Sequence, residues 1–139
     1  MEMSVSASLP REAVEIREEV FMWEQGFTEE FDRVDFNATH LVLWDEGFAV
    51  GTCRFYEVEE PGTFLVGRIA VRKPYRGQGL GAILVREAES HAKKAGAKRM
   101  LIHAQNQAVP FYQKQGYLPN GKTDEEQGCP HTWLEKALV

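Results

Sequence analysis

Apolar side chains recur at helical spacing in two long segments of the chain. Residues 11–23 place Val14, Val20 and Phe21 on one side of a helix whose other positions are mostly charged, and Gly26 follows its end. Residues 80–95 repeat the pattern, and Gly96 is placed as a C-cap just after the last apolar position. Residues 110–115 predict a short helix with proline in its first turn, and residues 28–35 predict another.

Runs of β-branched and aromatic residues predict strands between these helices. The chain then reads helix, helix, three antiparallel strands, helix, strand, helix, strand, which indicates a mixed α/β (α+β) sheet with helices packed on it. Residues 120–128 are polar and acidic, and we expect them to form a loop. The predicted strands are residues 4–9, 40–44, 48–56, 63–71, 99–104, a short restart at 117–118, and a closing strand at 131–138.

Composition and charge exclude several classes of protein. The 139 residues have the length of one domain (1–139), with 43% hydrophobic and 27% charged residues. The net charge of −5 argues against a nucleic-acid partner. No apolar run reaches membrane-spanning length, and the N-terminus lacks the pattern of a signal peptide. Cys53 and Cys129 do not form a disulfide framework, so we expect a reduced, cytoplasmic protein.

The clearest local signal is a glycine-rich turn between the predicted strand 63–71 and the helix that starts at Leu80. Three basic residues crowd this turn in an acidic protein, and a strand–glycine–helix junction offers unpaired amides to phosphate. The turn lacks the Lys-Ser/Thr of a Walker loop and the G-x-G-x-x-G spacing of a dinucleotide site. It does contain Arg-x-x-Gly-x-Gly at Arg76, Gly79 and Gly81. The alternative is a purely structural turn.

This motif resembles the acetyl-CoA loop of the GNAT superfamily of N-acetyltransferases. A second segment, residues 108–117 (AVPFYQKQGY), is similar to the family's A-x-x-F-Y-x-x-x-G-F/Y signature. Trp23-Glu24-Gln25-Gly26, His40, Ala104-Gln105 and residues 128–131 resemble the ElaA-like branch. The resemblance covers nearly the whole chain and implies one GNAT domain with a mostly antiparallel sheet of about six to seven strands and about four helices.

The resemblance also implies where coenzyme A would bind. The strand end would offer backbone groups to the pantetheine arm, the glycine loop would hold the pyrophosphate, and the helix 110–115 would lie against the arm. Many members have Asn at the position of Gln105, so this contact departs from the common pattern. The implied cofactor-binding residues are Ile69, Ala70, Val71, Arg76, Gly77, Gln78, Gly79, Leu80, Gly81, Gln105 and Phe111.

Direct acetyl transfer to an amine needs a proton donor for the departing thiolate. Tyr112 in the second motif is our candidate, because a phenol with a pKa near ~10 stays protonated at neutral pH. The alternative is that Tyr112 only packs beneath the sheet.

The general base is less defined by the sequence. Glu24, Asp35, Glu126 and His131 lie on segments expected to border the acceptor cleft, and an imidazole pKa near ~6.5 suits His131 to the task. The alternative for His131 is a hydrogen bond to a backbone carbonyl. The alternative for Glu24 is local capping or pairing, and for Glu126 it is simple solvation. His40, His91 and His103 lack metal-ligand spacing, so we expect structural roles for them and no metal. Direct transfer requires no thiol nucleophile at Cys129.

The sequence therefore predicts an acetyl-CoA-dependent N-acetyltransferase with a small-molecule amine or amino-terminal acceptor. The alternatives are a non-catalytic CoA-binding module or sensor on the same fold, and an ATP-binding protein, for which a Walker lysine is missing. Carboxylates at the cleft (Glu24, Asp35 and Glu126) favour a cationic acceptor such as a polyamine or aminosugar. The exposed edge of the closing strand offers a surface for a homodimer.

Overall fold

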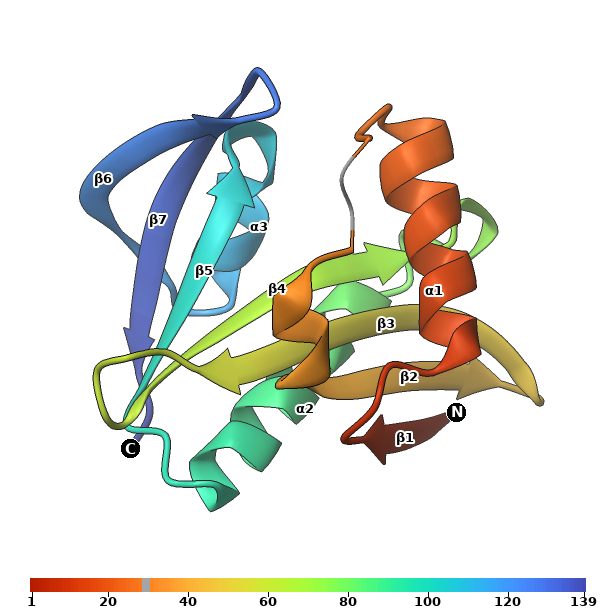
Figure 1. The fold of residues 1–139 in the computed structure, drawn as a ribbon, viewed down its shortest axis with the longest axis horizontal. Helices are drawn as coiled ribbons and strands as arrows, with labels where there is room; N and C mark the ends of the chain where they lie inside the picture. The colour runs from red at the N-terminus through yellow and green to blue at the C-terminus, as the bar shows by residue number, and fades with distance from the viewer. Residues whose placement is uncertain (29–30) are drawn as a thin grey trace.

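The computed structural model describes residues 1–28 and 31–139. Its strands form one seven-stranded sheet in the order β1-β2-β3-β4-β5-β7-β6 (Figure 1). The strands are β1 (Glu2–Ser6), β2 (Thr39–Asp45), β3 (Phe48–Glu57), β4 (Thr63–Val71), β5 (Arg99–Gln105), β6 (Leu118–Glu126) and β7 (Cys129–Ala137). The helices are α1 (Arg11–Arg17), α2 (Leu80–Lys94) and α3 (Val109–Lys114), with a π-helical η1 (Glu18–Glu24) and 3-10 turns η2 (Arg33–Phe36), η3 (Lys73–Tyr75) and η4 (Asn106–Ala108).

The two long amphipathic helices cover opposite faces of the sheet. Leu41 and Leu43 of β2 belong to the core cluster that contains the apolar side of α2. Val42, between them in sequence, belongs to the second cluster, together with Ala13 and Ile16 of α1. Successive strand residues point to opposite faces, so this alternation places the helices on two sides (Figure 1). The predicted mixed sheet with flanking helices is confirmed.

Strands β4 and β5 separate after a short parallel pairing. Their register covers only Thr63–Leu65 against Arg99–Leu101. Beyond this point β4 carries a bulge, because Cys53 of β3 faces both Arg68 and Ile69 between the pairs Thr52↔Ala70 and Arg54↔Gly67. Arg68 has a φ of +49°, which is unusual for a residue with a Cβ. A bulge bends the strand that contains it, so β4 turns away from β5 and the sheet opens (Figure 1).

The C-terminal part of the sheet differs from the sequence prediction. Residues 120–128 were expected to form a loop, but β6 continues to Glu126 and only Gln127 and Gly128 separate it from β7. The prediction was wrong because eight of the nine β6 residues are exposed, so the strand has no apolar alternation. β7 lies between β5 and β6 and pairs with both. The free edge therefore belongs to β6, and the edge expected for a homodimer is not on the closing strand.

Other differences are smaller. The first strand spans Glu2–Ser6 and not residues 4–9. The helix predicted over residues 28–35 appears in the described residues only as η2, and residues 29–30 lie outside the described part of the chain. No helix in the described residues is long and apolar enough to cross a membrane.

Candidate active site

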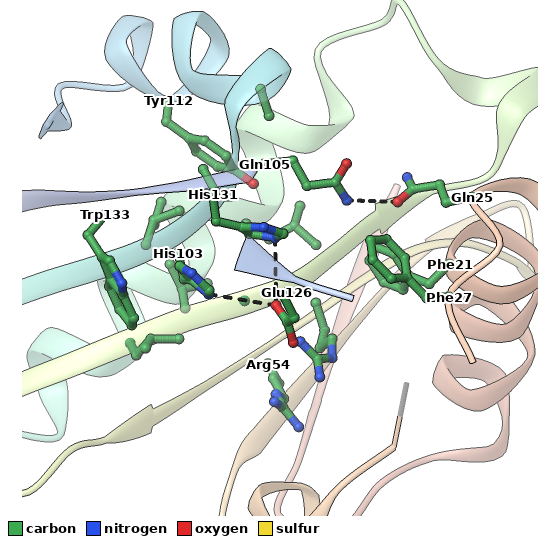
Figure 2. A pocket seen from close by; sticks show the side chains of 18 of the residues that line it. Phe21, Gln25, Phe27, Arg54, His103, Gln105, Tyr112, Glu126, His131 and Trp133 are labelled. Carbon is green, nitrogen blue, oxygen red and sulfur yellow. Dashed lines mark hydrogen bonds and ion pairs between the residues drawn. The ribbon is translucent and has the colours of Figure 1, made fainter. Parts of the chain in front are cut away.

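The opening between β4 and β5 contains a cavity of ≈ 690 Å³. Its walls come from segments that are distant in sequence: the end of η1, the bulged part of β4, the ends of β5 and α3, and the β6–β7 hairpin (Figure 2). Leu65, Gly67 and Ile69 line it from β4, and Ile102 and Ala104 line it from β5. The cavity is large enough for a small-molecule ligand.

The glycine-rich turn forms the junction between β4 and α2, as the sequence predicts. Gly77 and Gly79 have φ angles of +81° and +77°, a region that residues with a Cβ rarely adopt. Gly79 is the N-cap of α2, so the first amides of this 15-residue helix have no acceptor within the helix. A Cβ on Gly81 would lie 3.1 Å from Cζ of Phe111, so this glycine lets α3 approach α2 closely. The backbone is thus arranged to receive an anion.

Two of the basic side chains of this turn are paired with carboxylates of η1. Arg76 donates from Nη1 and Nη2 to Glu24 at 2.5 and 2.8 Å, and from Nε to the carbonyl of Val71 at 2.8 Å. Arg72 donates to Glu19 at 3.0 Å. The hydrogen bond from Arg76 lowers the pKa of Glu24, which makes this carboxylate a weaker base. Glu24 and Arg76, predicted separately as a base and a phosphate ligand, therefore contact each other.

Tyr112 lies on α3 and lines the cavity. Its ring packs edge-on against Phe111 and Tyr117, with centroid separations of 5.0 and 6.4 Å. Burial raises the pKa of its hydroxyl above the ordinary value, so the phenol stays protonated. In Figure 2 the hydroxyl end of this side chain points toward Gln105 and His131. Both expectations for Tyr112, ring packing and a protonated hydroxyl at the cleft, agree with this position.

Gln105 stands at the end of β5 and reaches across the cavity. Its Nε2 donates to Oε1 of Gln25 at 2.8 Å, which links β5 to the residue that follows η1 (Figure 2). The bond crosses the opening near the residues expected to hold the pantetheine arm. The side-chain amide of Gln105 is therefore engaged by Gln25 in this structure, and its contact with coenzyme A stays a prediction.

His131 and Glu126 meet in the wall opposite η1. His131 is 4% exposed, and its Nδ1 donates to the carbonyl of Cys129 at 2.7 Å. Its Nε2 then carries the lone pair of the neutral ring and lies 3.6 Å from Oε2 of Glu126. The backbone hydrogen bond considered as the alternative role is present, but it uses only one ring nitrogen. The other nitrogen faces the cavity.

His103 lines the cavity, although the spacing of histidines in the sequence predicted only a structural role for it. It lies on β5 and stacks on Trp133 with ring centroids 4.4 Å apart. Its Nε2 donates to Oδ1 of Asp124, and this hydrogen bond lowers the pKa of the Asp124 carboxyl. His40 differs, because it is buried and its Nε2 donates to the carbonyl of Asp35 at 2.9 Å, a structural role as expected. Only the register of three strands brings His103 to the cavity.

Asp35 does not stand free at the cleft. It accepts two hydrogen bonds from Arg17, at 2.8 and 3.1 Å, and one from Arg54 at 2.8 Å, and it is 4% exposed. Burial alone would raise its pKa, but the two guanidinium groups outweigh burial and lower the pKa to about 2. Glu24 and Asp35 are both paired with arginines, and Glu126 alone of the three predicted carboxylates lines the cavity.

Comparison with known proteins assigns this arrangement to a family. The profile of the acetyltransferase (GNAT) family matches residues 5–117. The chain is 36% identical over 129 residues to the uncharacterized N-acetyltransferase YjcF of Bacillus subtilis, with 91% of each chain covered.

Solved structures show the same fold. A candidate N-acetyltransferase from Lactobacillus plantarum superposes with a TM-score of 0.90 and 30% identity, covering 99% of this chain and 98% of its own. ElaA of Escherichia coli superposes with a TM-score of 0.85 and 23% identity, covering 97% and 98% of the two chains. The fold resemblance to ElaA expected from the sequence is confirmed, and the chain belongs to the GNAT family of acetyltransferases.

Proposed function

We propose that this protein is an acetyl-CoA-dependent N-acetyltransferase that transfers the acetyl group directly to an amine of a small molecule or an amino-terminal acceptor. The observation that carries the proposal is the opening between β4 and β5. It joins a loop suited to phosphate at one end to a cavity at the other, and Tyr112 and His131 face that cavity. Family membership supports the same activity.

The residues of the loop and strand fit coenzyme A. The amides at the start of α2 and the two left-handed glycines form a cradle that a Cβ would strain. Past Leu65, the register of β4 with β5 ends, so backbone groups between Val66 and Ala70 on the β5 side are available to an extended arm, and the Val71 carbonyl is engaged by Nε of Arg76. Arg76 would exchange Glu24 for a pyrophosphate oxygen. Gln105 at the end of β5 and Phe111 of α3, whose ring packs beside Gly81 at the start of α2, would lie beside the arm.

Acetyl-CoA, when bound, supplies a thioester carbonyl that an amine attacks, giving an amide and a thiol. An amide N–H of the bulged part of β4 would stabilise the negative charge on the carbonyl oxygen, a donor worth about 3 kcal/mol when it is well placed. His131 Nε2 would take the proton that the ammonium form of the acceptor must lose, and Glu126 at 3.6 Å would stabilise the resulting imidazolium. Tyr112 would donate a proton to the sulfur and regain one from the acceptor nitrogen.

The first test is calorimetric titration with acetyl-CoA. We expect micromolar binding to the wild type and loss of binding in Gly79→Glu, which places bulk and negative charge at the phosphate cradle. Gly96→Glu is the matched control, because Gly96 also has a positive φ (+103°) and lies just past the other end of α2. Equal loss of binding in both variants would mean that backbone strain, and not the cradle, is responsible.

A second comparison separates the enzyme from a CoA-binding module that lacks turnover. Tyr112→Phe keeps the ring contacts with Phe111 and Tyr117 but removes the hydroxyl. We expect turnover to fall by roughly 10²- to 10⁴-fold, with acetyl-CoA affinity unchanged. Equal losses in turnover and affinity would contradict the role of Tyr112 as the acid. A wild type that binds acetyl-CoA but acetylates no amine in a screen of polyamines, aminosugars and peptide amino-termini would favour the module.

A further inference from the structure

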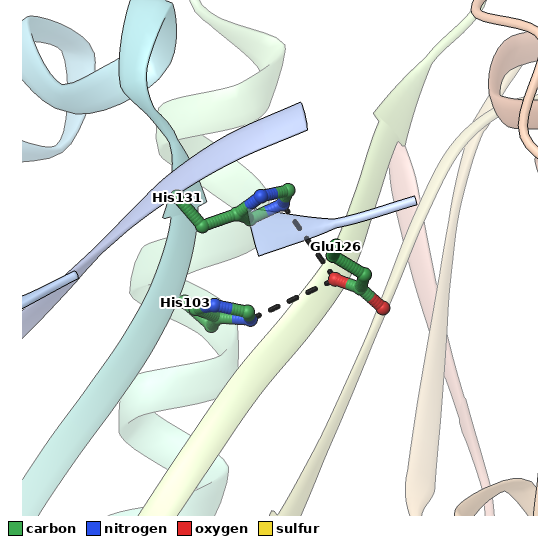
Figure 3. A group of neighbouring side chains, drawn as sticks. All are labelled: His103, Glu126 and His131. Atoms are coloured by element: carbon green, nitrogen blue, oxygen red, sulfur yellow. Dashed lines mark ion pairs between the residues drawn. The ribbon is translucent and has the colours of Figure 1, made fainter. Parts of the chain in front are cut away.

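Three potential metal ligands converge in the wall of the cavity. His103 of β5, Glu126 at the end of β6 and His131 of β7 each offer one ligand atom, and these atoms all lie within 4.8 Å of one another (Figure 3). Oε2 of Glu126 is 3.7 Å from Nδ1 of His103 and 3.6 Å from Nε2 of His131. The two imidazole rings are neighbours, with centroids 4.5 Å apart.

Both imidazoles are oriented by hydrogen bonds at their outer nitrogens. His131 donates from Nδ1 to the carbonyl of Cys129 at 2.7 Å. His103 donates from Nε2 to Asp124, whose other oxygen accepts from Nε1 of Trp133 at 3.2 Å. When the outer nitrogen carries the proton, the inner nitrogen of a neutral ring carries a lone pair. A carboxylate or carbonyl behind each imidazole is the usual arrangement around histidine ligands.

The strands fix these positions before any ion binds. In the ladders, His131 pairs with Gln105 of β5 and with Asp124 of β6, and Trp133 pairs with His103. Residues two apart along a strand share a face, so 103 and 105, 124 and 126, and 131 and 133 project to the same side of β5, β6 and β7. All three ligand residues line the cavity, which gives an ion a route of entry.

We propose that His103, Glu126 and His131 bind one divalent transition-metal ion, such as Zn²⁺, in the wall of the cavity formed by β5, β6 and β7. Zinc bonds of about 2.0–2.2 Å in a tetrahedron place the ligand atoms about 3.4 Å apart, so the two separations to Glu126 need to shorten by only a few tenths of an ångström. The separation between the two imidazole nitrogens is at most 4.8 Å, and side-chain rotation must close it further when the ion binds. Two imidazoles and one carboxylate suit zinc, and oxygen-preferring magnesium and calcium much less. The fourth position is left for water from the cavity.

Zinc would occupy Nε2 of His131, the atom that the proposed function assigns to proton uptake. The ion therefore inhibits acetyl transfer, and raising the metal concentration lowers turnover at constant acetyl-CoA. This regulatory consequence rests on the proposed function. The proposed binding site itself does not rest on that function, because it depends only on the three donor groups and on the hydrogen bonds that orient the two imidazoles.

The test is metal binding to the full chain after treatment with a chelator. Calorimetry with Zn²⁺ measures stoichiometry and affinity, and the visible spectrum with Co²⁺ reports the geometry of the ligands. We expect one ion per chain, a four-coordinate Co²⁺ spectrum, and affinity at least about tenfold weaker in Glu126→Gln and in His103→Gln. Glu126 and His103 are partly exposed, so these changes preserve the fold, which thermal melting checks.

His91→Gln is the matched control. His91 forms an i,i+4 pair with Glu87 on α2, with Nε2 3.5 Å from the carboxylate. This exposed histidine–carboxylate pair could itself bind Zn²⁺ weakly, so it serves as the comparison for the cavity site. Unchanged affinity in His91→Gln supports the cavity site. The proposal is overturned by a wild type that binds no Zn²⁺ at micromolar concentrations, by equal affinity in Glu126→Gln, or by loss of binding in His91→Gln alone.

Failure of the metal site and failure of the proposed function are distinguishable. If no amine is acetylated with or without chelator, the transferase proposal fails and the Zn²⁺ and Co²⁺ data still decide the metal site. If Zn²⁺ binds at the three residues and turnover is unaffected, the metal site holds and proton uptake by His131 is refuted. If the chelated enzyme turns over and Zn²⁺ binds only at other residues, the transferase proposal holds and the metal site is refuted.

Discussion

Replacing Asp35 with asparagine should destabilise the protein strongly and in a pH-dependent way. The carboxylate joins α1 to β3 through Arg17 and Arg54, which are 1% and 4% exposed. Its pKa is about 2 in the folded protein and 3.8 ordinarily. The difference corresponds to about 2 kcal/mol, since one pKa unit is worth about 1.4 kcal/mol. Asparagine also leaves buried guanidinium charge unpaired, and breaking such pairs costs about 3–5 kcal/mol. We expect a loss of 2–5 kcal/mol at pH 7.

The pH dependence follows from the direction of the shift. Because the folded pKa lies below the unfolded pKa, the stabilisation is fully present above about pH 4 and is lost as the pH falls toward 2. At pH 3 the wild type should already have lost about 1 kcal/mol of it, while Asp35→Asn loses nothing at this position. The stability gap between the two proteins should therefore narrow on acidification.

Urea unfolding at several pH values between 7 and 3 measures this gap. Asp45→Asn is the control, because Asp45 of β2 makes no ion pair among the described residues, and its replacement should change stability by less than about 0.5 kcal/mol. A gap below that size for Asp35→Asn at pH 7, or a gap that stays constant toward pH 3, would refute the reasoning. The first result would mean that water solvates the arginines once the carboxylate is gone.

Three further predictions test other contacts. Glu24→Gln should tighten acetyl-CoA binding several-fold by calorimetry, because it releases Arg76 for the pyrophosphate; a large fall in kcat would instead indicate that Glu24 is the base. Ellman's reagent should modify Cys129 in the native protein and spare Cys53, which is 1% exposed and whose pKa burial raises; equal rates would contradict this. Tyr117→Phe removes a buried hydroxyl that donates to the carboxylate of Glu89 on α2 at 2.8 Å, and it should lower the free energy of unfolding in urea by about 1–2 kcal/mol. No decrease would mean that water replaces this hydrogen bond.

The sequence predicts the cofactor loop well because the signals for it are local. Gly77 and Gly79 are needed at positive φ, and the first apolar residue of α2 follows directly. These requirements act over a few neighbouring residues, so they are visible in a linear pattern. The pairing of Arg76 with Glu24 is different, since it joins residues 52 positions apart. Basic residues in the loop could be counted from the sequence, but their neutralisation by η1 required the fold.

The cavity wall formed by α3, β6 and β7 could be predicted only in part for the same reason. Tyr112 belongs to a motif within one short helix, and the structure places it at the cavity. Glu126 was expected to border the cleft, but as a member of a polar loop. An exposed edge strand needs no apolar residues, because its backbone hydrogen bonds to β7 hold it in place. The hydrophobic pattern therefore contained no signal for β6.

The pairing of β7 with both β5 and β6 explains why polar side chains lie next to the opening between β4 and β5. β5 pairs with β4 at one end and with β7 along its whole length, so β5, β7 and β6 diverge together from the bulged part of β4. The same ladders place His103, Glu126 and His131 on β5, β6 and β7, where all three line the cavity. The cavity therefore has the β4 backbone on one side and titratable side chains of β5, β6 and β7 on the other.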